Sequence, residues 1–236
     1  MTDDVDIEFL CDPALAGTIP APEPAIRFAP EWFRRMDREM GMPDEQGLPG
    51  LTVKACLPVT DAFSLGYVIP LPYAVTFGGG TGIPNLDIRW AEDCAFRPIE
   101  QHHPGQLGAP DPPFAGVVPL KFVNPWRVRV PEGYSVLFQP VMNRPDLPFY
   151  CFSGLVDCDR FATTINFPFI WTGGTQETTL EAGTPIVQLV PIRRDALIKR
   201  HGSRGSTPAE LAEQDAARHR KYNEESTYRK EWRVRK

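Results

Sequence analysis

The chain has 236 residues, of which 42% are hydrophobic and 23% charged, and its net charge is −5. A chain of this length buries most of its unfolded surface, so a disulfide or metal staple is not needed for folding. Its apolar runs are shorter than the roughly 20 residues of a membrane helix, and the acidic N-terminal sequence lacks a signal-peptide pattern. We therefore expect a cytoplasmic protein with no membrane partner.

The distribution of charges and cysteines along the chain argues against some classes of function. Residues 1–192 carry 12 Lys/Arg against 23 Asp/Glu, which makes nucleic acid an unfavourable partner for this part of the chain. The five cysteines are odd in number, widely spaced and without a C-x-x-C pair, so we expect reduced thiols and no zinc knuckle. The 26 prolines disfavour long helices and favour short strands joined by turns.

The N-terminal region predicts one strand and one helix. Residues 5–11 (VDIEFLC) alternate between apolar and polar side chains, as a half-buried strand does. Residues 31–40 contain helix formers and are followed by a Gly and a Pro that stop a helix. In this helix Trp32, Phe33 and Met36 share one buried face.

From residue 51 onward the pattern predicts an all-β region. Short segments rich in β-branched and aromatic residues follow one another, punctuated by Pro, Gly and Asn-Pro. The predicted strands cover 51–57, 66–77, 86–91, 117–123, 126–130, 134–141, 149–157, 163–171 and 185–192. The glycine-rich stretch 77–85 matches neither a phosphate-binding loop nor a dinucleotide fingerprint. Many short strands at this spacing are typical of a sandwich or barrel.

The last forty residues have a different character. Thr207, Pro208 and Glu210 form a capping box with proline at the first helical position, which predicts a helix over 208–222. Residues 193–236 carry 13 Lys/Arg against 7 Asp/Glu, so this segment is either a solvated helix or a contact for an anionic partner. We expect a single β-rich domain over 1–200, followed by a linker, helix and basic tail over 201–236.

Two motifs between residues 121 and 192 resemble those of a known superfamily. Gly154-Leu155-Val156-Asp157 is followed by Gly183-Thr184-Pro185-Ile186-Val187-Gln188-Leu189. This order resembles the core of the dUTPase/dCTP-deaminase superfamily, whose fold is called the β-clip. The resemblance implies a mainly β, clip-like barrel or sandwich with a short N-terminal helix and a C-terminal helical tail. It also implies a homo-oligomer with sites at subunit interfaces.

The nucleotide-binding part of that pattern is mostly missing. Arg160 stands where the family has a tyrosine that stacks on deoxyribose, and Asn143 and Arg144 are the remaining candidates for phosphate contacts. Over its full length the chain also resembles a family of bacterial and phage proteins of unknown activity. The shared motifs include K-F-x-N-P-W at 121–126 and P-x-G-Y-S at 131–135.

Asp157 and Asp159 are the strongest candidates for chemistry. Residues two apart share one face of a regular strand, and two adjacent carboxylates attract a cation, a shared proton or water. Asp157 is then a general base, or the pair binds Mg²⁺. The alternative is that Asp157 caps a hairpin and Asp159 pairs with Arg160 or Arg144 in solvent, where such charges contribute little.

The candidate ligand-binding residues surround this hairpin, with one outlier. They are Asn143, Arg144, Asp159, Arg160, Gln188 and His103. An iron site would use Glu100 and His103, but His102 and His103 are adjacent and point to opposite faces of a strand, so we predict no metal ligands.

The preferred interpretation is a small-molecule-binding β-barrel of that uncharacterised family, with a degenerate nucleotide-type site. Three alternatives stay open at this point. The first is a divergent Mg²⁺-dependent hydrolase of a nucleotide-like or phosphorylated substrate, with Asp157 as its base. The second is a non-haem iron (Fe²⁺) oxygenase, and the third is a structural or phage-associated interaction protein. Whether the protein is an enzyme is left open.

Overall fold

The computed structural model describes residues 6–43, 49–78, 86–108, 111, 113–114, 117, 119–223 and 227–234. The chain divides into two compact units, Met1–Ala196 and Leu197–Lys236. The first holds all the described strands and the second holds the C-terminal helices. Within the described ranges, no helix is long and apolar enough to span a bilayer. Whether residues 1–200 fold as one independent domain stays a prediction.

The first unit is mainly β, as the sequence predicts, and its described strands form five separate sheets rather than one closed barrel. A five-stranded sheet contains, in spatial order, β13 (Gly154–Val156), β11 (Tyr134–Gln139), β16 (Pro185–Arg193), β5 (Tyr67–Pro70) and β2 (Glu23–Pro24). A four-stranded sheet contains β12 (Phe149–Cys151), β14 (Phe167–Trp171), β9 (Leu120–Phe122) and β8 (Ile99–Gln101). The finer β-clip assignment stays a prediction.

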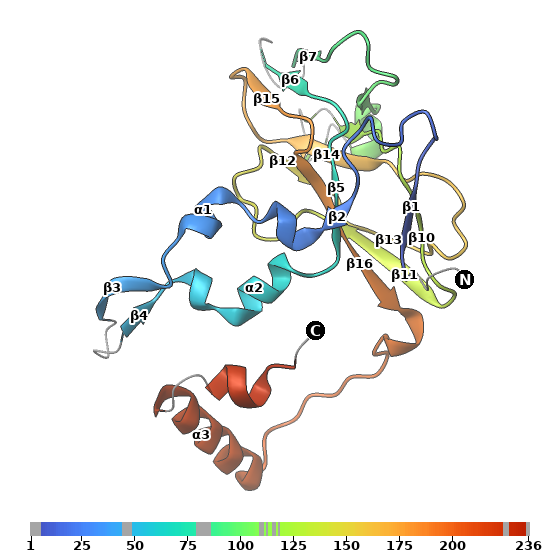
Figure 1. Ribbon diagram of the computed structural model, residues 1–236. Coiled ribbons are helices and arrows are strands. Elements are labelled where there is room, and N and C mark those ends of the chain that lie inside the picture. The colour runs from blue at the N-terminus through green and yellow to red at the C-terminus, as the bar shows by residue number, and fades with distance from the viewer. Residues whose placement is uncertain are drawn as a thin grey trace. The chain divides into compact units, whose positions relative to one another are not determined.

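Three smaller sheets complete this unit (Figure 1). One has three strands in the order β15 (Thr178–Leu180), β6 (Val75–Phe77) and β7 (Ile88–Arg89). The other two are the pairs β1 (Glu8–Leu10) with β10 (Arg127–Arg129) and β3 (Glu39–Pro43) with β4 (Pro49–Leu51). All the pairings are antiparallel, which suits short strands joined by turns.

Aromatic side chains hold the three- and four-stranded sheets together. Phe77 of β6 stacks on Trp171 of β14, with ring centroids 4.2 Å apart. On β14 itself, Phe169 stacks on Phe122 of β9 at 3.9 Å. All four side chains are buried, and each large apolar side chain removed from water contributes about 1.5–3 kcal/mol. The alternating pattern of β14 therefore anchors two sheets to one core.

The helices of the first unit differ from the prediction. The α1 helix (Glu31–Arg35) is shorter than predicted, because Met36 adopts an extended backbone and β3 begins at Glu39. Phe33 is buried against Phe63, but Trp32 of the predicted face is partly exposed. Of the strand predicted over 51–57, only Leu51 is strand, as the last residue of β4; the rest is wrong, since it holds the 3-10 turn Val53–Ala55 and the start of α2 (Leu57–Phe63).

The segment 149–157, predicted as one strand, is two strands in two different sheets. β12 pairs with β14, whereas β13 pairs with β11. The chain changes sheets between Cys151 and Gly154, so Asp157 follows directly after β13 and lies beside β11. This crossing determines the surroundings of both candidate aspartates.

The second unit contains α3 (Pro208–Asn223) and a π-helical turn, Tyr228–Trp232. The predicted capping box is present at the start of α3. The backbone N–H of Thr207 donates to Glu210 Oε2 at 2.7 Å, and the N–H of Glu210 donates to Thr207 Oγ1 at 3.3 Å. Two otherwise unpaired donors are thereby satisfied, which explains why this helix begins where the sequence predicts.

Candidate functional site

Asp159 is engaged in a bidentate ion pair with Arg194. The Nη1 of Arg194 donates to Asp159 Oδ1 at 3.0 Å, and its Nη2 donates to Oδ2 at 2.5 Å. The N–H of Gly133 donates to Oδ2 at 3.0 Å. Only 3% of the Asp159 side chain is exposed, so both carboxylate oxygens are occupied by protein donors. The ion pair is of the kind that the structural alternative predicted, but its partner is Arg194 rather than Arg160 or Arg144, and the carboxylate is buried rather than in solvent.

The same network controls the ionisation of Asp159. The hydrogen bond from Arg194 is the largest influence, and with the Gly133 N–H it lowers the pKa of Asp159 from 3.8 to about 2, against the opposing effect of burial. Arg194 also donates through Nη1 to the carbonyl of Tyr134 at 2.8 Å. One arginine therefore links three segments: the turn before β11, the turn after β13 and the end of β16.

Asp157 is the more accessible of the two carboxylates. Its side chain is 60% exposed, and its Oδ1 accepts a hydrogen bond from the Ser135 hydroxyl at 2.6 Å. Arg194 Nη1 lies 3.5 Å from the same oxygen. The backbone carbonyl of Asp157 accepts the N–H groups of Arg160 and Phe161, which closes the turn after β13. The two aspartates thus share one arginine.

The cysteine between the aspartates is not activated. Cys158 is buried, and this burial, followed by the charges of Asp159 and Asp157, raises the pKa of its thiol to about 11. The thiolate is therefore disfavoured at neutral pH.

Arg144 is committed to the protein itself. Its side chain is 11% exposed and forms a bidentate pair with Asp146, with Nε to Oδ1 at 2.9 Å and Nη2 to Oδ2 at 2.7 Å. Its Nη1 donates to the carbonyl of Phe28 at 3.1 Å. Burial acts to raise the pKa of Asp146, but the hydrogen bond and charge of Arg144 outweigh it, so that pKa is lowered. Asn143, next to it, is exposed and has a positive φ of 57° in a turn.

Gln188 is buried and hydrogen-bonded to the backbone at three points. Its Oε1 accepts from the Met142 N–H at 2.9 Å, and its Nε2 donates to the carbonyls of Ala62 and Leu65 at 3.2 and 2.6 Å. With 1% of its surface exposed, it ties β16 to the loop after β11 and to the end of α2. Its side-chain donor and acceptor atoms are therefore all engaged in hydrogen bonds that stabilise the fold.

The remaining predicted residues lie elsewhere on the surface. Arg160 is exposed in the turn after β13. His103 is exposed beyond the end of β8, where its Nδ1 accepts the N–H of Gly105 at 3.1 Å. Glu100 of β8 pairs with Lys121 of β9 at 2.7 Å. Across the part of the chain that the structure describes, no three His, Cys, Asp or Glu side chains are grouped as metal ligands.

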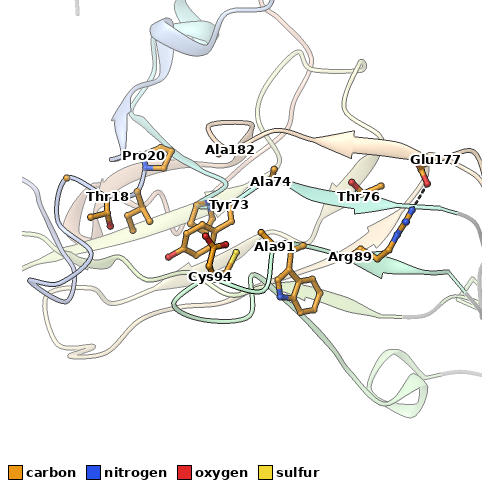
Figure 2. Close-up of a pocket in the computed structure, with 15 residues that line it drawn as sticks. Thr18, Pro20, Tyr73, Ala74, Thr76, Arg89, Ala91, Cys94, Glu177 and Ala182 are labelled. Carbon is orange, nitrogen blue, oxygen red and sulfur yellow. Dashed lines mark hydrogen bonds and ion pairs between the residues drawn. The ribbon is translucent and has the colours of Figure 1, made fainter.

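A pocket of about 880 Å³, drawn in Figure 2, has none of these residues in its described lining. Its lining comes from the loop before β2, the β5–β6 connection, β6, β7 with the segment after it, and both ends of β15. The lining residues are Gly17, Thr18, Ile19, Pro20, Pro72, Tyr73, Ala74, Thr76, Arg89, Trp90, Ala91, Asp93, Cys94, Glu177 and Ala182.

The two ends of this pocket differ in chemistry. At one end, Thr76 lies opposite Arg89 in the β6–β7 register, and Arg89 pairs with Glu177 (Figure 2). Figure 2 shows Tyr73 and Cys94 together at the other end. Burial, followed by the charge of Asp93, raises the pKa of the Cys94 thiol, although a hydrogen bond with the backbone of Ala91 acts in the opposite direction.

Comparisons with known proteins leave the family open. No family model matches the chain, and no curated protein matches it. Among solved structures, it is similar to a variant of the dUTPase of Staphylococcus bacteriophage 80alpha, solved with dUpNHpp. That similarity covers 86% of this chain and 89% of the other, at 11% identity and a TM-score of 0.36. A likeness this weak assigns neither the detailed fold nor a function.

The pocket contains no residue that the sequence analysis selected. Its walls come from four stretches that are far apart in the chain, so their adjacency has no local signal. The available hint is the segment 86–94 (LDIRWAEDC), where charged residues and a tryptophan interrupt a predicted strand. Only β7, two residues long, is strand here, and the rest turns away to line the cavity.

Proposed function

We propose that the protein binds a small organic molecule in the pocket between β6, β7 and the loop at 17–20. The observation that carries this proposal is the cavity itself, whose volume of about 880 Å³ suits a small ligand. Its lining combines apolar walls such as Pro20 and Pro72 with hydroxyl, aromatic and charged groups. Such a mixture gives a ligand both buried area and orientation.

The degenerate nucleotide-type site around Asp157 is a less favoured candidate. Arg144, Asp159 and Gln188 already satisfy partners within the protein, which leaves them few free hydrogen-bonding groups for a ligand. The Mg²⁺-dependent hydrolase, the Fe²⁺ oxygenase and the homo-oligomer stay predictions. The exposed carboxylate of Asp157 is the group through which the hydrolase hypothesis is testable.

A ligand screen with a blocked pocket tests the proposal. Full-length protein is mixed with a metabolite panel that includes nucleotides, amines and carboxylates, with and without Mg²⁺. A ligand well above its Kd raises Tm, because it stabilises only the folded state. Ala74→Trp fills the pocket at a position where the alanine is exposed. Ala162→Trp adds the same bulk at an exposed alanine outside the pocket.

The expected result is at least one compound that raises Tm in the wild type and in Ala162→Trp but not in Ala74→Trp. A compound that stabilises Ala74→Trp as strongly as the wild type binds elsewhere, and this overturns the assignment to the pocket. A panel without any hit favours the structural or interaction role instead.

A further inference from the structure

The pocket lies in a region of negative charge. Two of its lining residues, Asp93 and Glu177, are acidic, and two more acidic residues, Glu92 and Glu181, are next to lining residues in the chain. Asp87 lies two positions before the lining residue Arg89 and pairs with it. Among the described lining residues, Arg89 is the one basic side chain. The local balance is therefore strongly negative, as is that of residues 1–192 as a whole.

Arg89 is not available as an anion-binding group. Its Nη2 is paired with Glu177, and its Nε lies 3.1 Å from Asp87 Oδ2. The two carboxylates together therefore carry more negative charge than the guanidinium carries positive charge. A phosphate or carboxylate ligand entering the pocket would meet a surplus of negative charge, and it would have to displace these partners to reach Arg89.

The ring of Tyr73 forms part of the end opposite the Arg89–Glu177 pair, and the ring of Trp90 also lines the pocket. Tyr73 is half-buried and its ring packs against Phe96, with centroids 5.2 Å apart. Trp90 is half-buried, packs on the main hydrophobic core and also lines the pocket. An aromatic ring carries a negative face, which attracts an ammonium group within about 6 Å. Asp93 follows Trp90 closely, is exposed, and forms no ion pair among the described residues.

We infer that this pocket selects a small organic cation, an amine or quaternary ammonium compound, held by Tyr73 and Trp90 with Asp93 as its counter-charge. This inference rests on the proposed function, because it names the class of ligand for the same pocket. The Arg89–Glu177 pair occupies one end of the pocket, so the cation binds at the opposite end, where Tyr73 lies. Selectivity comes from repulsion of anions as well as attraction of the cation.

Protection of Cys94 from alkylation tests the inference in the full chain. Cys94 lines the pocket, whereas Cys56 is exposed elsewhere and acts as the internal control. Three probes of one branched skeleton are compared: choline, the neutral dimethylbutanol and the anionic dimethylbutanoate. Iodoacetamide modification of each cysteine is followed by peptide mass spectrometry. We expect choline to slow alkylation at Cys94 and to leave Cys56 unchanged.

Matched variants identify the groups responsible. Asp93→Asn removes the counter-charge and is expected to raise the half-protecting choline concentration roughly tenfold. Glu92→Gln removes the same charge from an exposed neighbour outside the lining, and we expect less than about a threefold change. Trp90→Leu keeps an apolar side chain but removes the ring, with an expected loss of roughly fivefold.

Other outcomes overturn the cation assignment and separate it from the proposed function. Equal or better protection by dimethylbutanoate or dimethylbutanol shows a pocket that binds ligands without selecting a cation. Failure of all three probes at tens of millimolar also rejects the cation class. The metabolite screen with Ala74→Trp then decides separately whether the pocket binds a ligand at all.

Discussion

The turn after β13 and the pocket beside β7 each contain an arginine between two carboxylates. The two sites differ in how deeply their ion pairs are buried. At the turn, Asp157 is 60% exposed, but only 3% of the Asp159 side chain and 30% of the Arg194 side chain are exposed. In the pocket, the exposed fractions are 64% for Glu177 and 54% for Arg89. The Asp159–Arg194 pair is part of the packed structure, whereas the Arg89–Glu177 pair borders an open cavity.

This difference shows which carboxylates are free for chemistry. A buried ion pair is stable only when hydrogen bonds satisfy its remaining atoms, and Asp159 meets this condition through Arg194 and Gly133. Exposed pairs are weak and exchange partners with water or ligand. Acidic residues near an arginine therefore indicate a ligand site only where the surroundings leave space for the ligand.

The largest effect is expected from Arg194→Met. This change keeps an apolar stem of similar length but leaves the Asp159 carboxylate almost unexposed and without its counter-ion. A buried, unpaired charge destabilises the folded state strongly, so we expect Tm at pH 7 to fall by several degrees. Adding Asp159→Asn to this variant removes the orphaned charge and should restore part of the loss.

Arg193→Met is the matched control. Arg193 precedes Arg194 and pairs with Asp195, but the two side chains are mostly exposed. We expect Tm to change little, since exposed pairs contribute little to stability. Equal losses for Arg193→Met and Arg194→Met would contradict the structural role of the Asp159 pair.

Lowering the pH is expected to have an intermediate effect on Tm. The pKa of Asp159 is about 2 in the folded protein, below its ordinary value of 3.8. A lowered folded-state pKa stabilises the protein above the unfolded pKa, and that stabilisation is lost as pH falls from about 4 to about 2. Tm against pH should therefore fall less steeply in this window for Asp159→Asn than for the wild type. Parallel curves would show that Asp159 titrates normally.

The smallest effect on stability is expected from Asp157→Asn. The side chain is 60% exposed, and an amide oxygen can still accept the Ser135 hydrogen bond at 2.6 Å, so Tm should stay nearly unchanged. Ligand binding in the pocket should also be unaffected. Wild-type protein that releases pyrophosphate from a nucleotide with Mg²⁺, together with loss of this activity in Asp157→Asn, would restore the hydrolase hypothesis.

Local sequence patterns were sufficient to predict several secondary-structure elements. The capping box at Thr207 and Glu210 predicts the start of α3, because its hydrogen bonds join residues three apart. Frequent prolines and β-branched residues predict a mainly β unit for a similarly local reason. By contrast, α2 was not predicted: only its first residue, Leu57, lies in a predicted strand, and seven residues with Pro58 near the start carry no clear helical period.

Contacts between distant segments determined which residues at the candidate sites are already bound within the protein. Gln188 lies in one of the two motifs on which the sequence resemblance rests, yet its partners Met142, Ala62 and Leu65 come from two distant segments. The role of Arg194 was not foreseen, because its partner Asp159 lies 35 residues away. Neither pairing has a periodicity or spacing that marks it in the sequence.

By itself, the sequence determined the β-rich character of the first unit, its acidic charge and the capped helix of the second. These properties follow from composition and from interactions between residues a few positions apart. Only the tertiary structure decided that Asp159 is neutralised by Arg194 and that residues near 18, 73, 90 and 177 enclose one cavity. Charge screening, burial and cavity shape depend on which distant segments pack together, and this packing exists only in the folded chain.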